Sequence, residues 1–243
     1  MPAPQSHAAF PITRWSLVVS SLRADDAALE ELCRLYWSPL YAFCRRSGLG
    51  AEDAEDVTQR FFQCLLEDRA GLLAEASPEG GRLRTLFLRV LKRRLVDHHR
   101  HSHREKRGAG KIVSLETAAV EAGLSAVSAD ATPEEVFDHQ WALSLLHLSL
   151  TRMERDYAAA GRTPHFLALV PFLGLGDAPP DSTHVQKSLG LSASAARQAV
   201  HRFRDRFRRH LRDEIAQTIA STDDAAIDRE LEGLQNALRR SRR

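Results

Sequence analysis

One stretch of the chain, residues 192–212, repeats basic side chains at a spacing that could bind a polyanion. On a helix, which turns by about 100° per residue, residues three or four apart share one face. The basic face of this stretch contains Arg197, His201, Arg204, Arg208 and Arg212. The apolar face contains Ala196, Val200, Phe203, Phe207 and Leu211. The pattern predicts a helix that buries one face and offers the other to a negative partner, although a solvated arginine face on an ordinary surface helix would have the same pattern.

The residues before this stretch predict a turn and a shorter helix. Ser192 stands where an N-cap is expected, since its hydroxyl can accept a hydrogen bond from a free N–H of the first helical turn. Upstream, residues 184–189 have a helical pattern that Gly190 ends. A short helix, a glycine-containing turn and an amphipathic basic helix are typical of a helix-turn-helix, whose second helix enters the major groove. This combination favours DNA as the negative partner.

Two further clusters raise the question of metal or acid–base chemistry. The acidic cluster contains Glu52, Asp53, Glu55 and Asp56, and the histidine cluster contains His98, His99, His101 and His103. The acids fall in the first turns of an expected helix, where the helix dipole favours negative charge. Arginines surround the histidines, without a cysteine or an organised set of carboxylates, so a helix end that contacts phosphate is the better interpretation than a metal site. With no nucleophile motif and no glycine-rich phosphate loop, the sequence predicts neither an enzyme nor a cofactor.

Composition predicts an all-α protein of two small helical domains joined by a flexible linker. The chain has 243 residues, 43% of them hydrophobic, and leucine and alanine dominate while β-branched runs are almost absent. The formal net charge of +2 hides strong segregation. Residues 25–81 hold twelve acids against five bases, a net of −7, whereas residues 82–107 hold ten bases against two acids, a net of +8. Such alternation indicates separate surfaces for separate partners.

Nothing in the sequence suggests a membrane or an oxidising compartment. The cysteines, Cys33, Cys44 and Cys64, are odd in number and lack metal-binding spacing, so we expect small buried residues in a reducing cytoplasm. The N-terminus lacks the basic start and apolar run of a signal peptide. The longest apolar run, residues 166–175, is too short to span a bilayer and contains Pro171. We therefore expect a cytoplasmic protein with no membrane partner.

Hydrophobic periodicity divides the chain into helical units. Helices are expected from residue 13, at 27–46 with a kink or break at Pro39, and at 51–68, 82–107, 133–160, 164–173 and 192–212. The expected domains are a flexible arm (1–12), a first helical unit (13–107), a flexible linker with at most one short helix (108–132), a second helical unit (133–215) and a C-terminal extension (216–243).

Two of these helices have faces that can be assigned from the pattern. In residues 51–68 the apolar seam is Val57, Phe61, Cys64 and Leu65, and the expected exposed residues are Asp56, Gln59, Arg60 and Gln63. In residues 82–107 the expected inward residues are Leu83, Leu86, Phe87, Val90, Leu91, Leu95 and Val96. The residues expected to face outward there are Arg84, Arg89, Lys92, Arg93, Arg94 and Arg100.

Taken together, these parts resemble the sigma factors of bacterial RNA polymerase. The chain is most similar to the extracytoplasmic-function (ECF) group, which keeps only sigma domains two and four, and the resemblance covers residues 13–107 and 133–220. The segment AEDAEDVTQRFFQCLLE resembles the helix that docks on the clamp of the largest polymerase subunit. RLRTLFLRVLKRRLVDHHR resembles the segment that grips the minus-ten promoter element, and the last four helices resemble the domain that reads the minus-thirty-five element. TRWSLV near the start is similar to an atypical, ECF-like branch.

The resemblance implies a role for individual residues. It assigns docking on core polymerase, by contact or by packing, to Asp53, Asp56, Gln59, Phe61 and Phe62. It assigns the minus-ten element to Lys92, Arg93, Asp97 and Arg100, with Arg93 replacing an asparagine that is usual in the family. It assigns base and phosphate contacts at the minus-thirty-five element to Arg197, Gln198, His201 and Arg202, and the basic face adds Arg204 and Arg208. DSTHVQKSLG replaces the usual tyrosine-rich entry to the helix-turn-helix.

The partners that follow are core RNA polymerase and promoter DNA, and an anti-sigma factor is typical of the family. The chief alternative is a stand-alone helix-turn-helix regulator, which would bind duplex DNA by itself as a symmetric dimer. A third alternative is a metal-dependent enzyme built on the histidine and acidic clusters.

Overall fold

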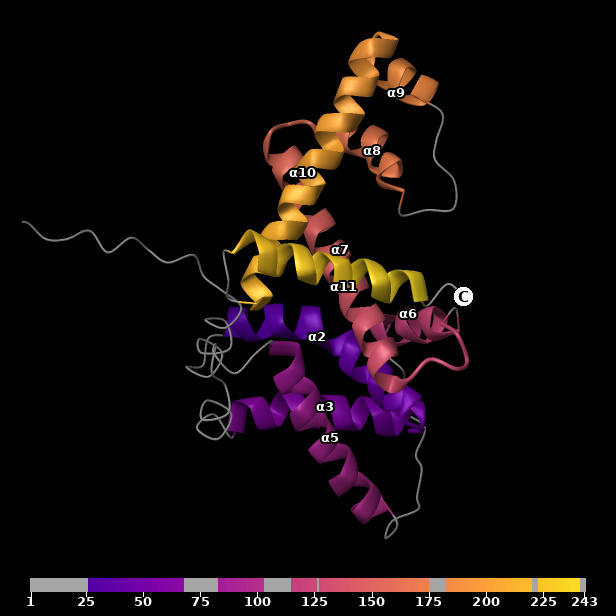
Figure 1. The fold of residues 1–243 in the computed structure, drawn as a ribbon, viewed down its shortest axis with the longest axis vertical. Coiled ribbons are helices and arrows are strands. Elements are labelled where there is room, and N and C mark those ends of the chain that lie inside the picture. Colours follow the sequence, from indigo (N-terminus) through magenta and orange to yellow (C-terminus); the bar gives the residue numbers. More distant parts are fainter. Residues whose placement is uncertain are drawn as a thin grey trace, which may run out of the picture.

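The computed structural model describes residues 26–67, 83–102, 115–125, 127–174, 182–219 and 223–240. Within these ranges every regular element is helical, which confirms the expected all-α class. The expected arm, the helix expected from residue 13 and the basic residues after Ser102 lie outside the described residues. Figure 1 shows an elongated arrangement, with α9 at one end of the long axis and α5 toward the other.

The first part of the fold is built around α2 (Asp26–Arg46), which packs against α3 (Ala51–Glu67) and α5 (Leu83–Ser102). Of the kink or break expected at Pro39, the structure excludes the break, because α2 continues through the proline as one helix. An internal proline costs roughly 3 kcal/mol through the lost hydrogen bond and the ring clash. Leu35, Tyr36 and Leu40 on either side of it are at most 1% exposed, and the burial of such side chains offsets that cost.

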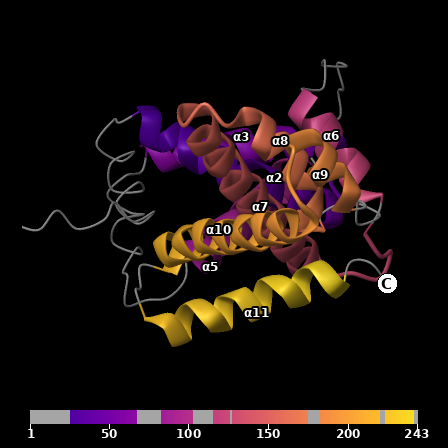
Figure 2. The ribbon, with the colours of Figure 1, turned by 90° about the horizontal axis from the view of Figure 1, so that it is seen from above.

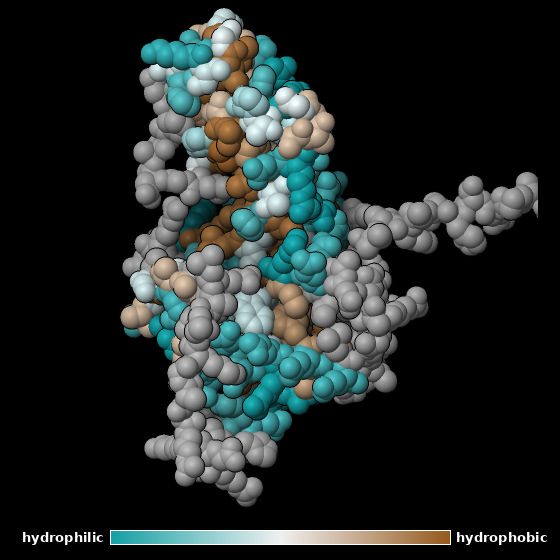
Figure 3. Space-filling view, turned by 180° about the vertical axis from the view of Figure 1, so that it is seen from behind, coloured by the Kyte–Doolittle hydropathy of each residue, from teal (hydrophilic) through white to brown (hydrophobic). Residues whose placement is uncertain are grey.

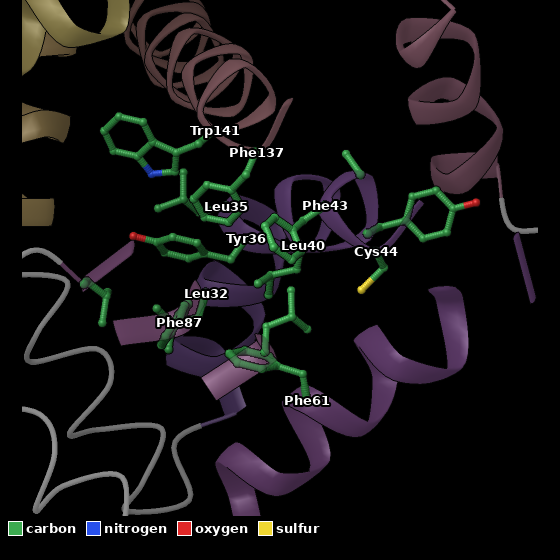
Figure 4. Close-up of a cluster of buried hydrophobic side chains, with 14 of the residues drawn as sticks. Leu32, Leu35, Tyr36, Leu40, Phe43, Cys44, Phe61, Phe87, Phe137 and Trp141 are labelled. Carbon is green, nitrogen blue, oxygen red and sulfur yellow. The ribbon is translucent and has the colours of Figure 1, made fainter. Parts of the chain in front are cut away.

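Aromatic rings hold the three helices together. The ring centroid of Phe87 in α5 lies 4.6 Å from that of Tyr36 in α2 and 5.2 Å from that of Phe61 in α3, both edge-to-face. Figure 4 shows these side chains converging with leucines of α2. Edge-to-face pairs add about 0.5–1.5 kcal/mol each beyond the burial of area. Phe87, the one aromatic residue of its segment, is therefore a core residue, as its spacing predicts.

Helix α7 (Pro133–Ala159) connects two hydrophobic clusters. It begins at residue 133, as expected, and there Thr132 and Glu135 form a capping box, in which each side chain accepts a hydrogen bond from the other residue's backbone N–H. Phe137 and Trp141 in its first half belong to the cluster around α2 (Figure 4), and so does Leu145. Met153 and Tyr157 in its second half belong to the other cluster. The change of packing partners thus falls inside α7, not at the expected boundary between residues 132 and 133.

The second cluster contains α8 (Thr163–Leu169), the 3-10 helix η2 (Val170–Leu173), α9 (Ser182–Leu189) and the first half of α10 (Ala193–Ile219). Ring centroids of Tyr157, Phe166 and Phe203 lie 5.6–5.9 Å apart. The second half of α10 returns to the first cluster through Leu211 and Ile215.

The C-terminal helix α11 (Asp224–Arg240) packs against α7 and α10; it crosses their direction in Figure 1, and the view from above shows it beside α10 (Figure 2). It contributes Ile227 and Leu234 to the first cluster, so the described part of the C-terminal extension belongs to the core. Helices α7 and α10 both cross from one cluster to the other, and two long helices therefore connect the two parts of the molecule.

Part of the expected flexible linker is an anchored helix, α6 (Leu115–Leu124). Tyr41 and Arg45 of α2 both donate hydrogen bonds of 2.5 Å to the carboxylate of Glu121 in α6. Arg46 donates to the backbone carbonyls of Ser128, Ala129 and Ala131. Residues 115–125 and 127–132 are consequently held against the end of α2, whereas residues 108–114 and 126 lie outside the described residues.

Candidate nucleic-acid interface and docking surface

The turn between α9 and α10 has the local chemistry that the sequence predicts. Gly190 adopts a φ of +63°, a left-handed conformation that costs glycine little and other residues more. The Ala195 N–H donates to Ser192 Oγ at 3.3 Å, so Ser192 caps α10 as expected. Val185 of α9 and Ala196 of α10 are buried in the second hydrophobic cluster. Packing and capping together fix this helix–turn–helix geometry.

The first turns of α10 present a freely accessible polar surface. Arg197, Gln198 and Arg202 are exposed, and no other described residue lies within ion-pair distance of either arginine. Lys187 on the preceding α9 is also exposed. Free guanidinium groups and a carboxamide at the start of a protruding helix can bind phosphates and the edges of bases.

Farther along α10 the basic face is largely occupied by contacts within the chain. Asp205 pairs with His201 Nδ1 at 2.8 Å and with an Arg208 guanidinium nitrogen at 3.0 Å. Arg204 Nε donates to the backbone carbonyl of Phe172 in η2 at 2.8 Å. Arg212 pairs with two carboxylates of α11. The five basic positions therefore do not form one free cationic stripe, and Arg204 has a structural partner that its spacing did not reveal.

On α5 the predicted minus-ten residues have different surroundings. Arg93 and Asp97 are exposed, whereas the side chain of Arg100 lies outside the described part of the chain. Lys92 Nζ lies 2.7 Å from Glu134 Oε1 of α7 and 5.8 Å from the centroid of the Phe43 ring. This hydrogen bond holds the pKa of Glu134 below its usual value, outweighing the opposite effect of partial burial. Lys92 is thus paired with the first turn of α7.

Two expectations for α5 are wrong. The Arg84 side chain, expected to face outward, is only 13% exposed. Its guanidinium carbon lies 4.7 Å from the centroid of the Trp141 ring. Its guanidinium nitrogens lie 3.1 Å from a carboxylate oxygen of Glu230 and 3.4 Å from one of Asp138. Its position places it against α7 and α11, which are distant in sequence. Val96, expected inward, is 50% exposed because it lies about 100° around the helix from Leu95, the last residue of the buried stripe.

The acidic end of α3 forms a second candidate surface. Asp53 and Gln59 are exposed and Asp56 is half-buried, so these three predicted docking residues remain reachable by a partner. Phe61 and Phe62 are buried, and Phe62 stacks on Trp37 at 6.0 Å, so both phenylalanines support the helix by packing. His98 Nε2 of α5 approaches Asp53 at 3.7 Å, a contact between α3 and α5 that no sequence signal predicted.

Arg152 forms a junction that sequence reasoning missed. Its guanidinium lies 3.0 Å from Glu31 of α2 and 2.8 Å from Glu214 of α10, and Glu214 is fully buried. The three residues are far apart in the chain and lie on different helices, so no local spacing could have identified them.

Other kinds of site have little support in the described residues. Among them, no three His, Cys, Asp or Glu side chains gather closely enough to hold a metal ion. Of the helices described, none combines the length and the apolarity needed to cross a bilayer. A pocket of about 260 Å³ lies between α2 and α6, but the Arg45 and Arg46 guanidiniums that line it already donate to Glu121 and to backbone carbonyls.

The surface seen from behind is mixed in character. Hydrophobic residues form an interrupted band along the long axis there, with hydrophilic residues on both sides (Figure 3).

Comparisons of the chain with protein-family models, with curated proteins and with solved structures find no match. The chain's own residues and geometry therefore carry the functional argument, and the partners considered below are those that the sequence resemblance implies.

Proposed function

We propose that this chain is a sigma-type initiation factor that docks on core RNA polymerase through α3 and directs it to promoters through α5 and α10. The observation that carries the proposal is the α9–Gly190–α10 unit, which presents Arg197, Gln198 and Arg202 at one end of the molecule. The resemblance of the sequence to ECF sigma factors supplies the identity of the partners.

The chemistry of these side chains suits promoter DNA. An arginine can donate two hydrogen bonds to guanine O6 and N7, and a glutamine can pair in the same way with adenine N6 and N7. Arg197 and Gln198 are neighbours in the first turns of α10, the part of a recognition helix that reaches base edges. Arg202 and Lys187 are exposed nearby and suit phosphate contacts, which supply affinity that falls as salt increases.

The opposite charges of α3 and α5 support two distinct partners. The first turn of α3 is acidic, with Glu52 and Asp53. Gln59 is exposed about two turns further along the same helix. Arg89 and Arg93 are exposed on α5. A polyanion is attracted to the second surface and repelled by the first, so α3 suits a protein partner and α5 suits DNA.

The proposal is tested by a gel shift and by reconstituted transcription, each with and without core polymerase. The expected result is promoter-specific initiation that requires both proteins. The double variant Asp56→Ala, Gln59→Ala should lose polymerase binding while circular dichroism and the melting temperature stay near wild type. Gln235→Ala, an exposed glutamine on α11, is the matched control and should bind normally.

The outcomes separate the proposal from its chief alternative. Tight, sequence-specific binding to duplex DNA by the chain alone, with no effect of core polymerase, would support a stand-alone helix-turn-helix regulator. Full transcription by the Asp56→Ala, Gln59→Ala variant would show that α3 is not the docking helix.

A further inference from the structure

We infer that Arg152 is a positioning residue that locks the candidate DNA-reading helices α5 and α10 into one frame and thereby sets the separation of the two DNA elements read. The inference rests on the proposed function for its DNA readout. Its structural part, a rigid junction at Arg152, stands on contacts alone and is tested separately below.

The junction joins three helices through one guanidinium. Arg152 of α7 lies 3.0 Å from Glu31 Oε1 of α2 and 2.8 Å from Glu214 Oε1 of α10. Glu214 is fully buried, so its carboxylate has no bulk water to replace a lost partner. The Arg152 side chain is 35% exposed, so the pair is buried on the Glu214 side only, and removing the guanidinium takes from that buried carboxylate a partner that bulk water cannot replace, which is unfavourable. Any hinge motion that separates α7 from α10 at this level meets that resistance.

The junction lies between the two hydrophobic clusters, where it can restrict their relative motion. Along α7, Arg152 follows Leu145 of the first hydrophobic cluster and directly precedes Met153 of the second. It is therefore located where the two parts of the molecule meet. Asp156, one turn further, pairs with His210 at 3.2 Å and so adds a link between α7 and α10, but Arg152 also reaches α2.

Each candidate DNA surface is attached to one side of this junction. α5 packs on α2 and α3, and the α9–α10 turn lies beyond the second cluster, at the far end of the long axis (Figure 1). The chain between residues 115 and 132, expected to be slack, is anchored to α2. The two surfaces are therefore related by the continuous helices α7 and α10 and not by a loose tether.

A rigid relation between two DNA-reading surfaces restricts the DNA that fits both. Inserting two base pairs between two elements moves one by about 7 Å and rotates it by roughly 70°, since a turn holds about 10 base pairs over about 34 Å. A frame that cannot follow this change loses base contacts at one end. Each lost bidentate contact lowers affinity by about tenfold.

The structural part is tested by distance measurements on the full chain. Spin labels are carried by unnatural amino acids at Thr85 of α5 and Ser188 of α9, both exposed. Wild type should give one narrow distance distribution. Arg152→Ala should broaden it, and Arg155→Ala, an exposed arginine on the same helix, should leave it unchanged. Glu31→Gln removes the charge that ties Arg152 to α2 and leaves the pair between Arg152 and Glu214 in place. Because the link to α2 is lost, this variant should broaden the distribution even if Arg152→Ala folds poorly.

The functional part is tested by transcription with core polymerase on templates that differ only in spacer length. Wild type and Arg155→Ala should favour one spacer by about tenfold over one that is two base pairs longer. For Arg152→Ala or Glu31→Gln this ratio should fall to about twofold. A broad wild-type distribution, unchanged distributions in both junction variants, or an unchanged spacer preference despite a broadened distribution would overturn the inference. Absence of initiation on every template would refute the proposed function, while the distance measurement would still decide whether the junction is rigid.

Discussion

Replacing Leu145 with alanine tests whether the first half of α7 belongs to the core around α2. Leu145 is fully buried in that cluster, whereas Leu143, two residues earlier on the same helix, is 40% exposed. Deleting a buried leucine side chain costs its transfer free energy and leaves a cavity, together about 3 kcal/mol. The same change at Leu143 should cost less than about 1 kcal/mol. The two variants make the same substitution and differ only in how deeply the replaced leucine is buried.

The assay is urea and thermal unfolding followed by both circular dichroism and tryptophan fluorescence. For a chain of this size, a loss of 3 kcal/mol lowers the melting temperature by about 6–12 °C. Because α7 and α10 pass through both hydrophobic clusters, the two probes should give one coincident transition in wild type and in both variants. Two separate transitions, with the change at Leu145 affecting neither or only the later part of the chain, would refute this account of the fold.

Three further predictions concern the surfaces and the anchored linker. Arg197→Ala should weaken promoter binding by about tenfold and relax its sequence preference, measured by fluorescence anisotropy on matched and mismatched promoters against the control Arg155→Ala; equal binding by both variants would contradict a recognition role. The pKa of Glu121 lies below its usual value, chiefly because Arg45 donates a hydrogen bond to its carboxylate. The ionised Glu121 side chain therefore stabilises the fold above pH 4.5, and this contribution is lost as the pH falls below that value. Glu121→Gln should therefore lower the urea midpoint at pH 7, the difference from wild type shrinking in acid; a difference independent of pH would argue against the ion pair. Because Phe87 is buried, α5 offers few aromatic platforms on which unstacked bases could stack. Permanganate footprinting should therefore detect weak promoter melting that requires near-ideal promoters. Broad opening on mismatched promoters would contradict this prediction.

Local chemistry made several features predictable from the sequence. The boundaries of α3, the capping box at Thr132 and the N-cap at Ser192 depend on residues within one or two turns of each other. Amphipathic spacing likewise identified the buried face of α10, including Phe203, because a helix repeats its faces every three or four residues. Arg197 lies on the basic face that the same spacing identified, whereas the resemblance to sigma factors implied a DNA-contacting role for Gln198 and Arg202; all three residues are exposed.

Tertiary packing decided the features that depend on residues distant in the chain. A basic side chain such as Arg84 looks solvent-facing from its own helix, and only the arrival of Trp141 and Glu230 from other helices encloses it. Glu121 turns part of an expected linker into an anchored helix by meeting Arg45, and Arg152 joins three helices that share no local pattern. Periodicity therefore determined which faces are apolar, whereas the three-dimensional arrangement determined which charges are free, because ion-pair partners are chosen by proximity in space and not in sequence.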